Sequence, residues 1–357
     1  MPPIARARLS IDLDAIAANW RALDTRSAPG VETAAVLKAD AYGLGAAHVA
    51  PALARAGVRS FFVALAEEGV ALRAILGPGP AILVLSGLMP GDAEACRDHD
   101  LVPCLNSPGQ VAEHARLLPG RPAALQLDSG MNRLGLEPAE LDRIELAALA
   151  PVLVFSHLAC ADELTHPQNA AQLATFRALA ARFPGVRTSL AATGGILLGP
   201  DYHFGLTRPG IGLFGGAPFA EARPVVRLAL PVIQVREVAP AEAVGYGAAW
   251  IARRPARIAT LAAGYADGLL RALGTGGARL YAGAQACPIV GRVSMDLITA
   301  DVTDLAEVPS HLEILNDRQG IDDLAAAAGT IGYEILTSLG GRYDRVYNPP
   351  APPPDPA

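Results

Sequence analysis

The chain has 357 residues, of which 51% are hydrophobic and 18% are charged, and its formal net charge is −6. This length predicts one large barrel, or a barrel-sized domain with a smaller second domain. The acidic balance implies no nucleic-acid partner. Charge or proline interrupts the apolar runs before the roughly 20 residues of a membrane span. We therefore expect a cytoplasmic enzyme with no membrane contact.

Short apolar runs alternate with longer amphipathic stretches through the first two thirds of the chain. Eight runs predict strands: 34–38, 61–64, 81–85, 101–105, 123–127, 152–155, 187–191 and 204–207. The stretches between them predict helices, including 45–56, 66–76, 108–117 and 169–182. Eight such units in roughly 230 residues predict an α/β fold, a TIM (β/α)8 barrel. The active site of such a barrel lies where its strands end.

The pattern changes near Val225, where strand-like runs follow one another without long helices between them. Runs at 228–238, 257–261, 286–290, 297–302 and 311–315 predict a smaller, mostly β C-terminal domain. We therefore expect a barrel over residues 1–224 and a β domain over 225–347. The proline-rich residues 348–357 are predicted to be a disordered tail.

Lys38 is the only lysine, since the other 28 basic residues are arginines. A desolvated lysine amine can lose its proton and attack a carbonyl, whereas a guanidinium stays protonated. Chance retention or a buried ion pair are the alternatives. Cys96, Cys104, Cys160 and Cys287 show no spacing for disulfides or for a metal, so we expect reduced thiols and no metal site.

Polar residues follow the predicted strands where a barrel site would lie. Lys38 ends the first strand, Asp128 and Arg133 follow the fifth, and His157 ends the sixth. Arg208-Pro-Gly-Ile-Gly212 follows the eighth, and its backbone N–H groups could bind a phosphate. A phosphate beside a Schiff-base lysine suggests pyridoxal 5'-phosphate. A core histidine and an ordinary turn are the structural alternatives.

The chain resembles the alanine racemases of the pyridoxal-phosphate fold type III group. The segment Val36-Leu-Lys38-Ala-Asp-Ala-Tyr42-Gly43-Leu-Gly45 is similar to their cofactor-attachment signature. Further similar motifs follow in the family's order: Asp128-Ser-Gly-Met-Asn-Arg133, Ser156-His157-Leu-Ala, Arg208-Pro-Gly-Ile211, Val244-Gly-Tyr246-Gly, Gly264-Tyr265-Ala-Asp267, Gly291-Arg292-Val-Ser-Met295-Asp296 and Gly332-Tyr333-Glu334. The resemblance covers residues 5–348.

The resemblance implies a two-base interconversion of L- and D-alanine, which serves D-alanine biosynthesis or the catabolism of one enantiomer. Lys38 would carry the cofactor and serve one face of the substrate, and Tyr246 of a partner subunit would serve the other, which implies a homodimer with shared active sites. The implied cofactor contacts are Tyr42, Leu85, Thr193, Arg208, Gly210, Ile211 and Tyr333. The implied substrate contacts are Arg133 and Met295. The implied supporting and entry residues are His157, Asp162, Tyr265, Arg271 and Arg292.

Three residues depart from the family pattern. Gln126 replaces a lysine that is often carbamylated, and its amide could still orient Arg133. Leu44 stands where histidine is usual, and Ala192 stands where asparagine is usual. These departures put the substrate range and the cofactor affinity in question, while the reaction class stays the same.

Rival interpretations remain open from the sequence. A racemase of serine or of a broader amino-acid range fits the same fold. A non-catalytic pyridoxal-phosphate carrier would need neither the β domain nor Tyr246. A decarboxylase would usually place an acidic residue where Arg208 stands, and a cofactor-free lysine aldolase would not need the glycine turn.

Overall fold

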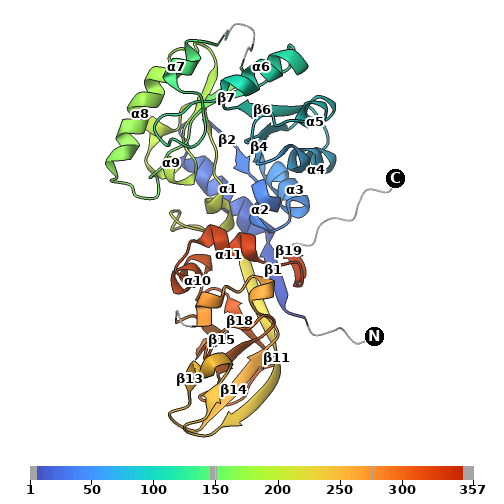
Figure 1. The fold of residues 1–357 in the computed structure, drawn as a ribbon, viewed down its shortest axis with the longest axis vertical. Coiled ribbons are helices and arrows are strands. Elements are labelled where there is room, and N and C mark those ends of the chain that lie inside the picture. Colours follow the sequence, from blue (N-terminus) through green and yellow to red (C-terminus); the bar gives the residue numbers. More distant parts are fainter. Residues whose placement is uncertain (1–5, 145–148, 150, 275–276, 349–357) are drawn as a thin grey trace. The chain divides into compact units, whose positions relative to one another are not determined.

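The computed structural model describes residues 6–144, 149, 151–274 and 277–348. Within them the chain forms two compact units (Figure 1). One contains residues 16–223, and the other combines residues 6–15 with 224–348. No helix among the described residues is long and apolar enough to cross a membrane.

The first unit contains the predicted barrel. Its seven-stranded parallel sheet has the order β3 (Ala35–Val36), β4 (Ser60–Val63), β5 (Ala81–Val84), β6 (Leu101–Leu105), β7 (Ala124–Gln126), β8 (Leu153–Phe155) and β9 (Arg187–Ser189). The eighth strand, β10 (Leu206–Thr207), pairs with β2 (Glu32–Thr33). The Ala34 N–H donates to the Thr207 carbonyl, and the Gly205 N–H to the Thr188 carbonyl. Hydrogen bonds on both sides of β10 therefore close the ring, as predicted.

The helices that follow the strands surround this barrel (Figure 1). The four predicted helices are α3 (Ala46–Ala56), α4 (Ala66–Leu76), α6 (Pro108–Leu117) and α8 (Pro167–Ala180). The others are α1 (Leu13–Arg26), α2 (Lys38–Tyr42), α5 (Asp92–Asp98), α7 (Pro138–Leu141) and α9 (Thr193–Leu197). Helix α6 shows why these boundaries form: Ser107 accepts a hydrogen bond from the Gln110 N–H, and Pro108 takes the first helical position.

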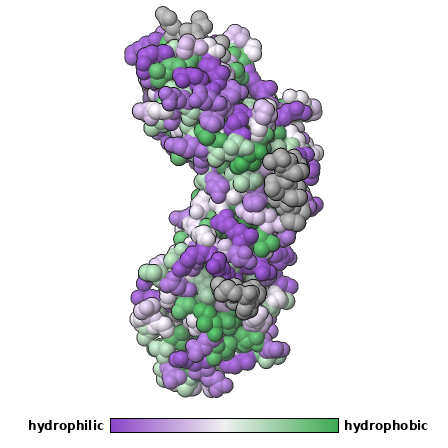
Figure 2. All heavy atoms as spheres, turned by 90° about the vertical axis from the view of Figure 1, so that its right-hand side faces the viewer, coloured by the Kyte–Doolittle hydropathy of each residue, from purple (hydrophilic) through white to green (hydrophobic). Residues whose placement is uncertain are grey.

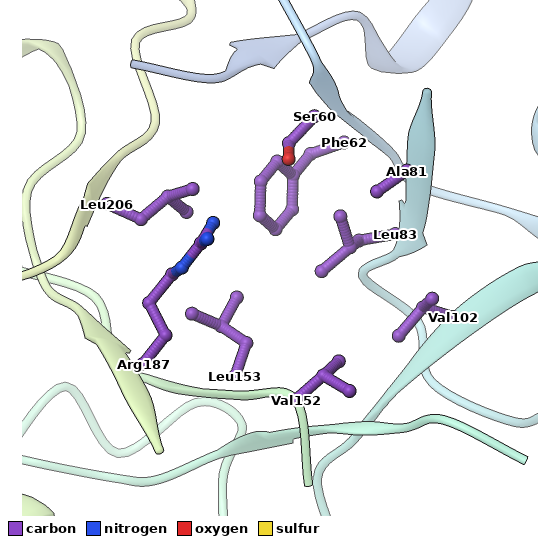
Figure 3. Close-up of a pocket in the computed structure, with 9 residues that line it drawn as sticks. All are labelled: Ser60, Phe62, Ala81, Leu83, Val102, Val152, Leu153, Arg187 and Leu206. Carbon is purple, nitrogen blue, oxygen red and sulfur yellow. The ribbon is translucent and has the colours of Figure 1, made fainter. Parts of the chain in front are cut away.

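A cavity of about 210 Å³ opens at the amino-terminal ends of the barrel strands (Figure 3). Its walls are mostly apolar, and Ser60 and Arg187 add polar atoms. The lining residues are Ser60, Phe62, Ala81, Leu83, Val102, Val152, Leu153, Arg187 and Leu206. Lys38 follows the opposite, carboxyl end of β3, so this cavity is separate from the predicted site.

The second unit is mostly β, as predicted. Its central strand, β11 (Val226–Val238), pairs with β1 (Arg8–Asp12), β14 (Ala256–Leu261) and β18 (His311–Leu315). The other strands are β12 (Ala243–Val244), β13 (Trp250–Ile251), β15 (Arg279–Ala282), β16 (Gln285–Pro288), β17 (Ile298–Asp301) and β19 (Asp344–Asn348). Two helices that the sequence analysis did not predict, α10 (Ile321–Ala328) and α11 (Gly332–Ser338), pack on each other.

The amino-terminal strand departs from the predicted domain layout, which began the barrel at residue 1. Strand β1 pairs antiparallel with β11 and parallel with β19, so it is part of the second unit. Asn348, the first residue of the predicted tail, ends β19. Residues 349–357 of that tail lie outside the described residues.

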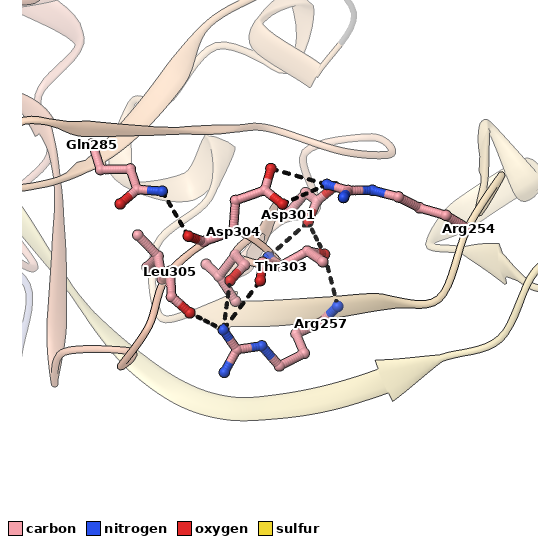
Figure 4. A network of polar contacts seen from close by, with 8 residues as sticks. Arg254, Arg257, Gln285, Asp301, Thr303, Asp304 and Leu305 are labelled. Atoms are coloured by element: carbon pink, nitrogen blue, oxygen red, sulfur yellow. Dashed lines mark hydrogen bonds and ion pairs between the residues drawn. The ribbon is translucent and has the colours of Figure 1, made fainter.

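Polar contacts hold the segment after β17 in place (Figure 4). The Arg257 guanidinium donates to the carbonyl oxygens of Val302, Thr303 and Leu305. Arg254 forms an ion pair with Asp304 at 2.8 Å. Arg257 therefore adds side-chain donors to the carbonyl groups of this loop and ties the loop to β14.

Candidate active site

Lys38 lies two residues after β3, at the carboxyl end of the barrel, and a backbone turn of unusual conformation follows it. The following residues, Ala39 to Tyr42, all have φ between 54° and 56°. L-residues avoid this left-handed region, at about 1–2 kcal/mol each, so the surrounding structure must hold the turn. Such strain is concentrated at functional sites.

The Lys38 amine is accessible to solvent, yet the protein around it removes part of its hydration. This desolvation lowers the pKa of the ammonium group, Arg133 lowers it further, and Glu68 raises it. A lowered pKa makes the unprotonated, nucleophilic amine more available near neutral pH.

Arg208 is a buried guanidinium whose partners are neutral. It donates to the Ser189 hydroxyl and to the Ser156 carbonyl, the latter at 2.6 Å. It also lies over the Phe155 ring, 4.9 Å from the centroid. Burial lowers the pKa of Arg208 to about 10, so the group still carries its charge at neutral pH. No carboxylate pairs with it among the described residues.

His157 lies two residues after β8, among cationic groups. Burial lowers its pKa to about 3, and Arg208, Arg133 and Lys38 lower it in the same direction. The ring keeps some solvent access. His157 is therefore neutral at physiological pH and can both donate and accept a hydrogen bond.

Thr193 and the turn after β10 form a cradle of glycine backbone and hydroxyl groups. The Thr193 hydroxyl accepts from the Gly210 N–H at 3.1 Å and from the Gly212 N–H at 3.3 Å. A Cβ atom on Gly210 would collide with the Tyr42 hydroxyl, so only glycine lets the backbone approach the turn that begins at Lys38. A cofactor with a phosphate and an aldehyde fits this place. The Gly210 backbone and the hydroxyl groups of Thr193 and Tyr42 suit the phosphate, and the Lys38 amine suits the aldehyde.

The loop after β7 carries Arg133. The Asp128 carboxylate accepts from the N–H groups of Gly130, Met131 and Asn132, the first at 2.8 Å, which fixes the start of this loop. Arg133 itself is exposed. The Gln126 amide donates to the Leu134 carbonyl at 3.3 Å, so it contacts the backbone of the residue that follows Arg133.

Buried polar residues behind this site were missed by the sequence analysis. The Gln172 amide donates to the His157 carbonyl at 2.9 Å and accepts from the Ala159 N–H at 2.8 Å. The Ser129 and Ser156 hydroxyls lie 2.8 Å apart. These contacts hold the segment after β8 that carries His157. The only signal was a glutamine among apolar residues on one face of a predicted helix.

The predicted residues of the second unit form a group of their own. Tyr246, Met295 and Tyr265 have exposed fractions of 71%, 55% and 43%. The Tyr265 N–H donates to the Ser294 carbonyl and the Ala266 N–H to the Met295 carbonyl, so these two loops are bonded together.

A Cβ atom added to Gly247 would lie 3.2 Å from the Arg292 guanidinium. Arg292 therefore packs beside the turn that contains Tyr246. Arg342 was missed by the sequence analysis. It pairs with Asp267 at 2.6 Å and with Asp296 at 2.7 Å, and so joins the segments that carry Tyr265 and Met295.

The remaining predicted residues are spread over both units. In the barrel unit, Ile211 is buried, Leu85 is half-buried after β5, and Asp162 is exposed. In the second unit, Tyr333 lies in α11 and Arg271 is exposed. Of the two other departures, Leu44 is fully buried and Ala192 precedes α9 without a side-chain cap.

The Lys38 amine with its lowered pKa, the cradle and the buried, charged Arg208 fit the class of barrel-type pyridoxal-phosphate enzymes with a separate β unit. Comparison with known families gives the same result. The model of the alanine racemase N-terminal domain matches residues 11–218, and that of the C-terminal domain matches residues 225–347. The chain belongs to the alanine racemase family and is thus a pyridoxal-phosphate-dependent isomerase.

Individual relatives support this assignment. An alanine racemase of Cereibacter sphaeroides is 62% identical over 346 residues, which are 96% of this chain and 99% of that protein. The alanine racemase of Bartonella henselae with covalently bound pyridoxal phosphate is 38% identical, with a TM-score of 0.92 over 96% of this chain and 100% of that chain. A biosynthetic alanine racemase of Pseudomonas aeruginosa is 35% identical, with a TM-score of 0.88. The match covers 96% of this chain and 99% of that chain.

Proposed function

We propose that the chain interconverts L- and D-alanine with two acid/base groups on opposite faces of the substrate. Lys38 is the group on one face, and Tyr246 of the partner subunit is the group on the other. The observation that carries this proposal is the single lysine of the chain, whose ammonium pKa is lowered at the carboxyl end of a barrel strand, beside the cradle of glycine backbone and hydroxyl groups.

The chain's own residues divide the chemistry between them. Bound pyridoxal phosphate would draw electrons from the α-carbon and so make its proton removable. Lys38 takes or returns that proton on its face. Arg208 offers the cofactor's ring nitrogen a hydrogen bond but, with a pKa of about 10, does not transfer its proton near neutral pH. Neutral His157 can accept from Arg208 and donate to a phenolate.

We assign the binding roles as follows. Tyr42, Thr193, Gly210, Ile211 and Tyr333 would hold the phosphate, and Leu85 would pack on the ring. Arg133 would approach the cofactor's phenolic oxygen. The Met295 N–H would bind the substrate carboxylate, which is supported by its donating no hydrogen bond within the described part of the chain. Asp162, Tyr265, Arg271 and Arg292 would line the substrate entry.

We further propose a homodimer that shares its active sites. Apolar residues gather on the surface of the second unit, as the green areas in the lower part of Figure 2 illustrate. Exposed residues of this unit include Ile233, Val235, Tyr246, Ile251, Met295 and Leu297. Covering such side chains favours association with a second copy of the chain. Sedimentation with an activity assay tests this, since a dilute monomer should be inactive.

We place this activity in the cytoplasm, in the supply of D-alanine. The acidic composition and the apolar runs that are too short for a span support the location. The biosynthetic racemase of Pseudomonas aeruginosa supports the role.

The decisive experiment follows α-deuteration in heavy water together with loss of optical rotation, over a panel of L-amino acids. Fastest exchange with alanine is expected, and borohydride-reduced enzyme is the control. Faster exchange of serine would reassign the substrate. Absence of exchange with every amino acid would favour a cofactor carrier.

A further inference from the structure

The Glu68 carboxylate, near the start of α4, joins two strand ends of the barrel. Its Oε1 accepts a hydrogen bond from the Ala39 N–H at 2.6 Å. Its Oε2 accepts from the Ala64 N–H at 2.7 Å and from the Leu65 N–H at 3.3 Å. Ala64 and Leu65 follow β4, and Ala39 follows Lys38. One side chain therefore fixes the segment after Lys38 against the neighbouring strand, since β3 and β4 are paired.

The segment that Glu68 holds is the left-handed turn. Its four residues, Ala39 to Tyr42, are all non-glycine with φ of 54° to 56°, a conformation that an isolated chain would leave. Hydrogen bonds within the region support it, such as Asp40 Oδ1 with the Ala46 N–H at 2.7 Å. Glu68 adds a charged acceptor at the first peptide of the turn, and charge-assisted bonds of this kind are stronger than neutral ones.

We propose that Glu68 is a positioning residue for Lys38: its carboxylate holds the first peptide of the left-handed turn and so fixes the direction in which the amine projects. This inference rests on the proposed role of Lys38. A misplaced amine lowers the rate of proton transfer even when the cofactor and substrate bind normally, because that rate depends on near-attack geometry.

The charge of Glu68 gives this role a second, measurable signature. The Lys38 ammonium is influenced by Glu68, which raises its pKa, and by Arg133, which lowers it. His157 is also within electrostatic range of Lys38, and it is neutral at physiological pH. Loss of the Glu68 charge should therefore shift the Lys38 pKa downward.

A purely structural role has to be separated from this one, because Glu68 also caps α4 through Ala64 and Leu65. Loss of a cap costs about 1 kcal/mol of stability but leaves the lysine unchanged. Three full-length variants separate the effects. Glu68→Gln keeps the reach and removes the charge. Glu68→Asp keeps the charge and shortens the reach. Glu67→Gln removes the same charge from the adjacent, exposed position and is the matched control.

Because Lys38 is the only lysine, isotope-labelled reductive methylation of cofactor-free protein marks one side chain and the amino terminus. Its NMR signal then gives the Lys38 pKa in each variant. The second measurement is kcat and KM of the loaded enzyme with alanine, and the third is the thermal midpoint.

Glu68→Gln is expected to lower the Lys38 pKa and to reduce kcat about tenfold or more with little change in KM. Glu68→Asp should reduce kcat while leaving that pKa near the wild-type value, and Glu67→Gln should match the wild type. If both Glu68 variants lose only thermal stability, the carboxylate is a helix cap and the inference is overturned. If borohydride fails to fix the cofactor on Lys38 of the wild type, the proposed function fails instead.

Discussion

Arg208 donates a hydrogen bond from Nη2 to the main-chain carbonyl oxygen of Ser156, 2.6 Å away. The carbonyl and the Ser189 hydroxyl compensate the buried guanidinium without a negative charge, so its donors stay oriented while it keeps its proton. This arrangement suits a partner that must offer a hydrogen bond and no proton to a ring nitrogen. It also explains why a carboxylate at this position would change the chemistry.

Replacing Arg208 by glutamate should change the course of the reaction. A carboxyl group would supply a proton to the ring nitrogen and make the cofactor a stronger electron sink, so transamination should increase relative to racemisation. The ratio of pyruvate to racemised alanine measures this. Arg208→Lys, which keeps a positive charge, is the control. An unchanged ratio in the glutamate variant would refute the role given to Arg208.

Lys38→Arg should abolish cofactor attachment and racemisation together, because a guanidinium does not form a Schiff base. The loss of activity should be at least about a thousandfold, and borohydride should no longer fix the cofactor to the chain. A double variant that adds Arg59→Lys restores one lysine at an exposed position and tests whether any amine suffices. Recovery of activity in that variant would show that position 38 is not special.

The barrel could be predicted because its strands are buried on both faces and therefore appear as uninterrupted apolar runs, such as 101–105, which the structure reproduces as β6. Strand β1 could not be assigned from its own residues, because its pairing with β11 and β19 involves segments more than two hundred residues away. Helices α10 and α11 are short, and glycine precedes or begins each of them, which weakens any periodic signal.

Lys38 and His157 stood out in the sequence because each places a polar group at the end of an apolar run, whereas Leu85 and Met295 came only from the family resemblance. Glu68 and Gln172 gave no such signal, since each lies on a helix where a polar residue is ordinary. Their roles depend on backbone groups that come near only in the folded chain: Ala39 for Glu68 and the His157 carbonyl for Gln172. Sequence pattern carries no information on such contacts.

Tyr246→Phe should remove proton transfer on one face only. Racemisation should fall by about 10² to 10⁴, while one enantiomer of alanine should still exchange its α-hydrogen through Lys38. Separate exchange measurements with L- and D-alanine in heavy water show this asymmetry. Tyr281→Phe, on β15 of the same unit, is the control. Equal exchange of both enantiomers in the Tyr246 variant would assign the second base elsewhere.

His157 should make the stability of the protein depend on pH. Its pKa is about 3 when folded and has an ordinary value of 6.5 when unfolded, so between these values the unfolded chain binds the proton more tightly. The stabilisation attributable to His157 is thus complete above pH 6.5 and is lost as the pH falls toward 3, by roughly 1 kcal/mol per pH unit.

Denaturant titrations measure this effect. The free energy of unfolding of His157→Asn should fall less steeply with pH than that of the wild type, whereas that of the exposed His311→Asn control should fall as in the wild type. Parallel curves for all three proteins would contradict the neutral state of His157.

Gly210→Ala should weaken cofactor binding. The added methyl group would collide with the Tyr42 hydroxyl, so either the turn or the tyrosine must move away from the cradle formed with Thr193. We expect the Kd for pyridoxal phosphate to rise at least about tenfold, which corresponds to about 1.4 kcal/mol.

A Tyr42→Phe change in the same chain removes the colliding oxygen and should recover part of the affinity, since it relieves the clash while losing one hydroxyl. Gly341→Ala, where an added Cβ meets nothing within 4 Å, is the matched control and should leave the Kd unchanged. Cofactor binding that is equally tight in the Gly210 and Gly341 variants would show that the close approach of residue 210 to Tyr42 does not form the phosphate site.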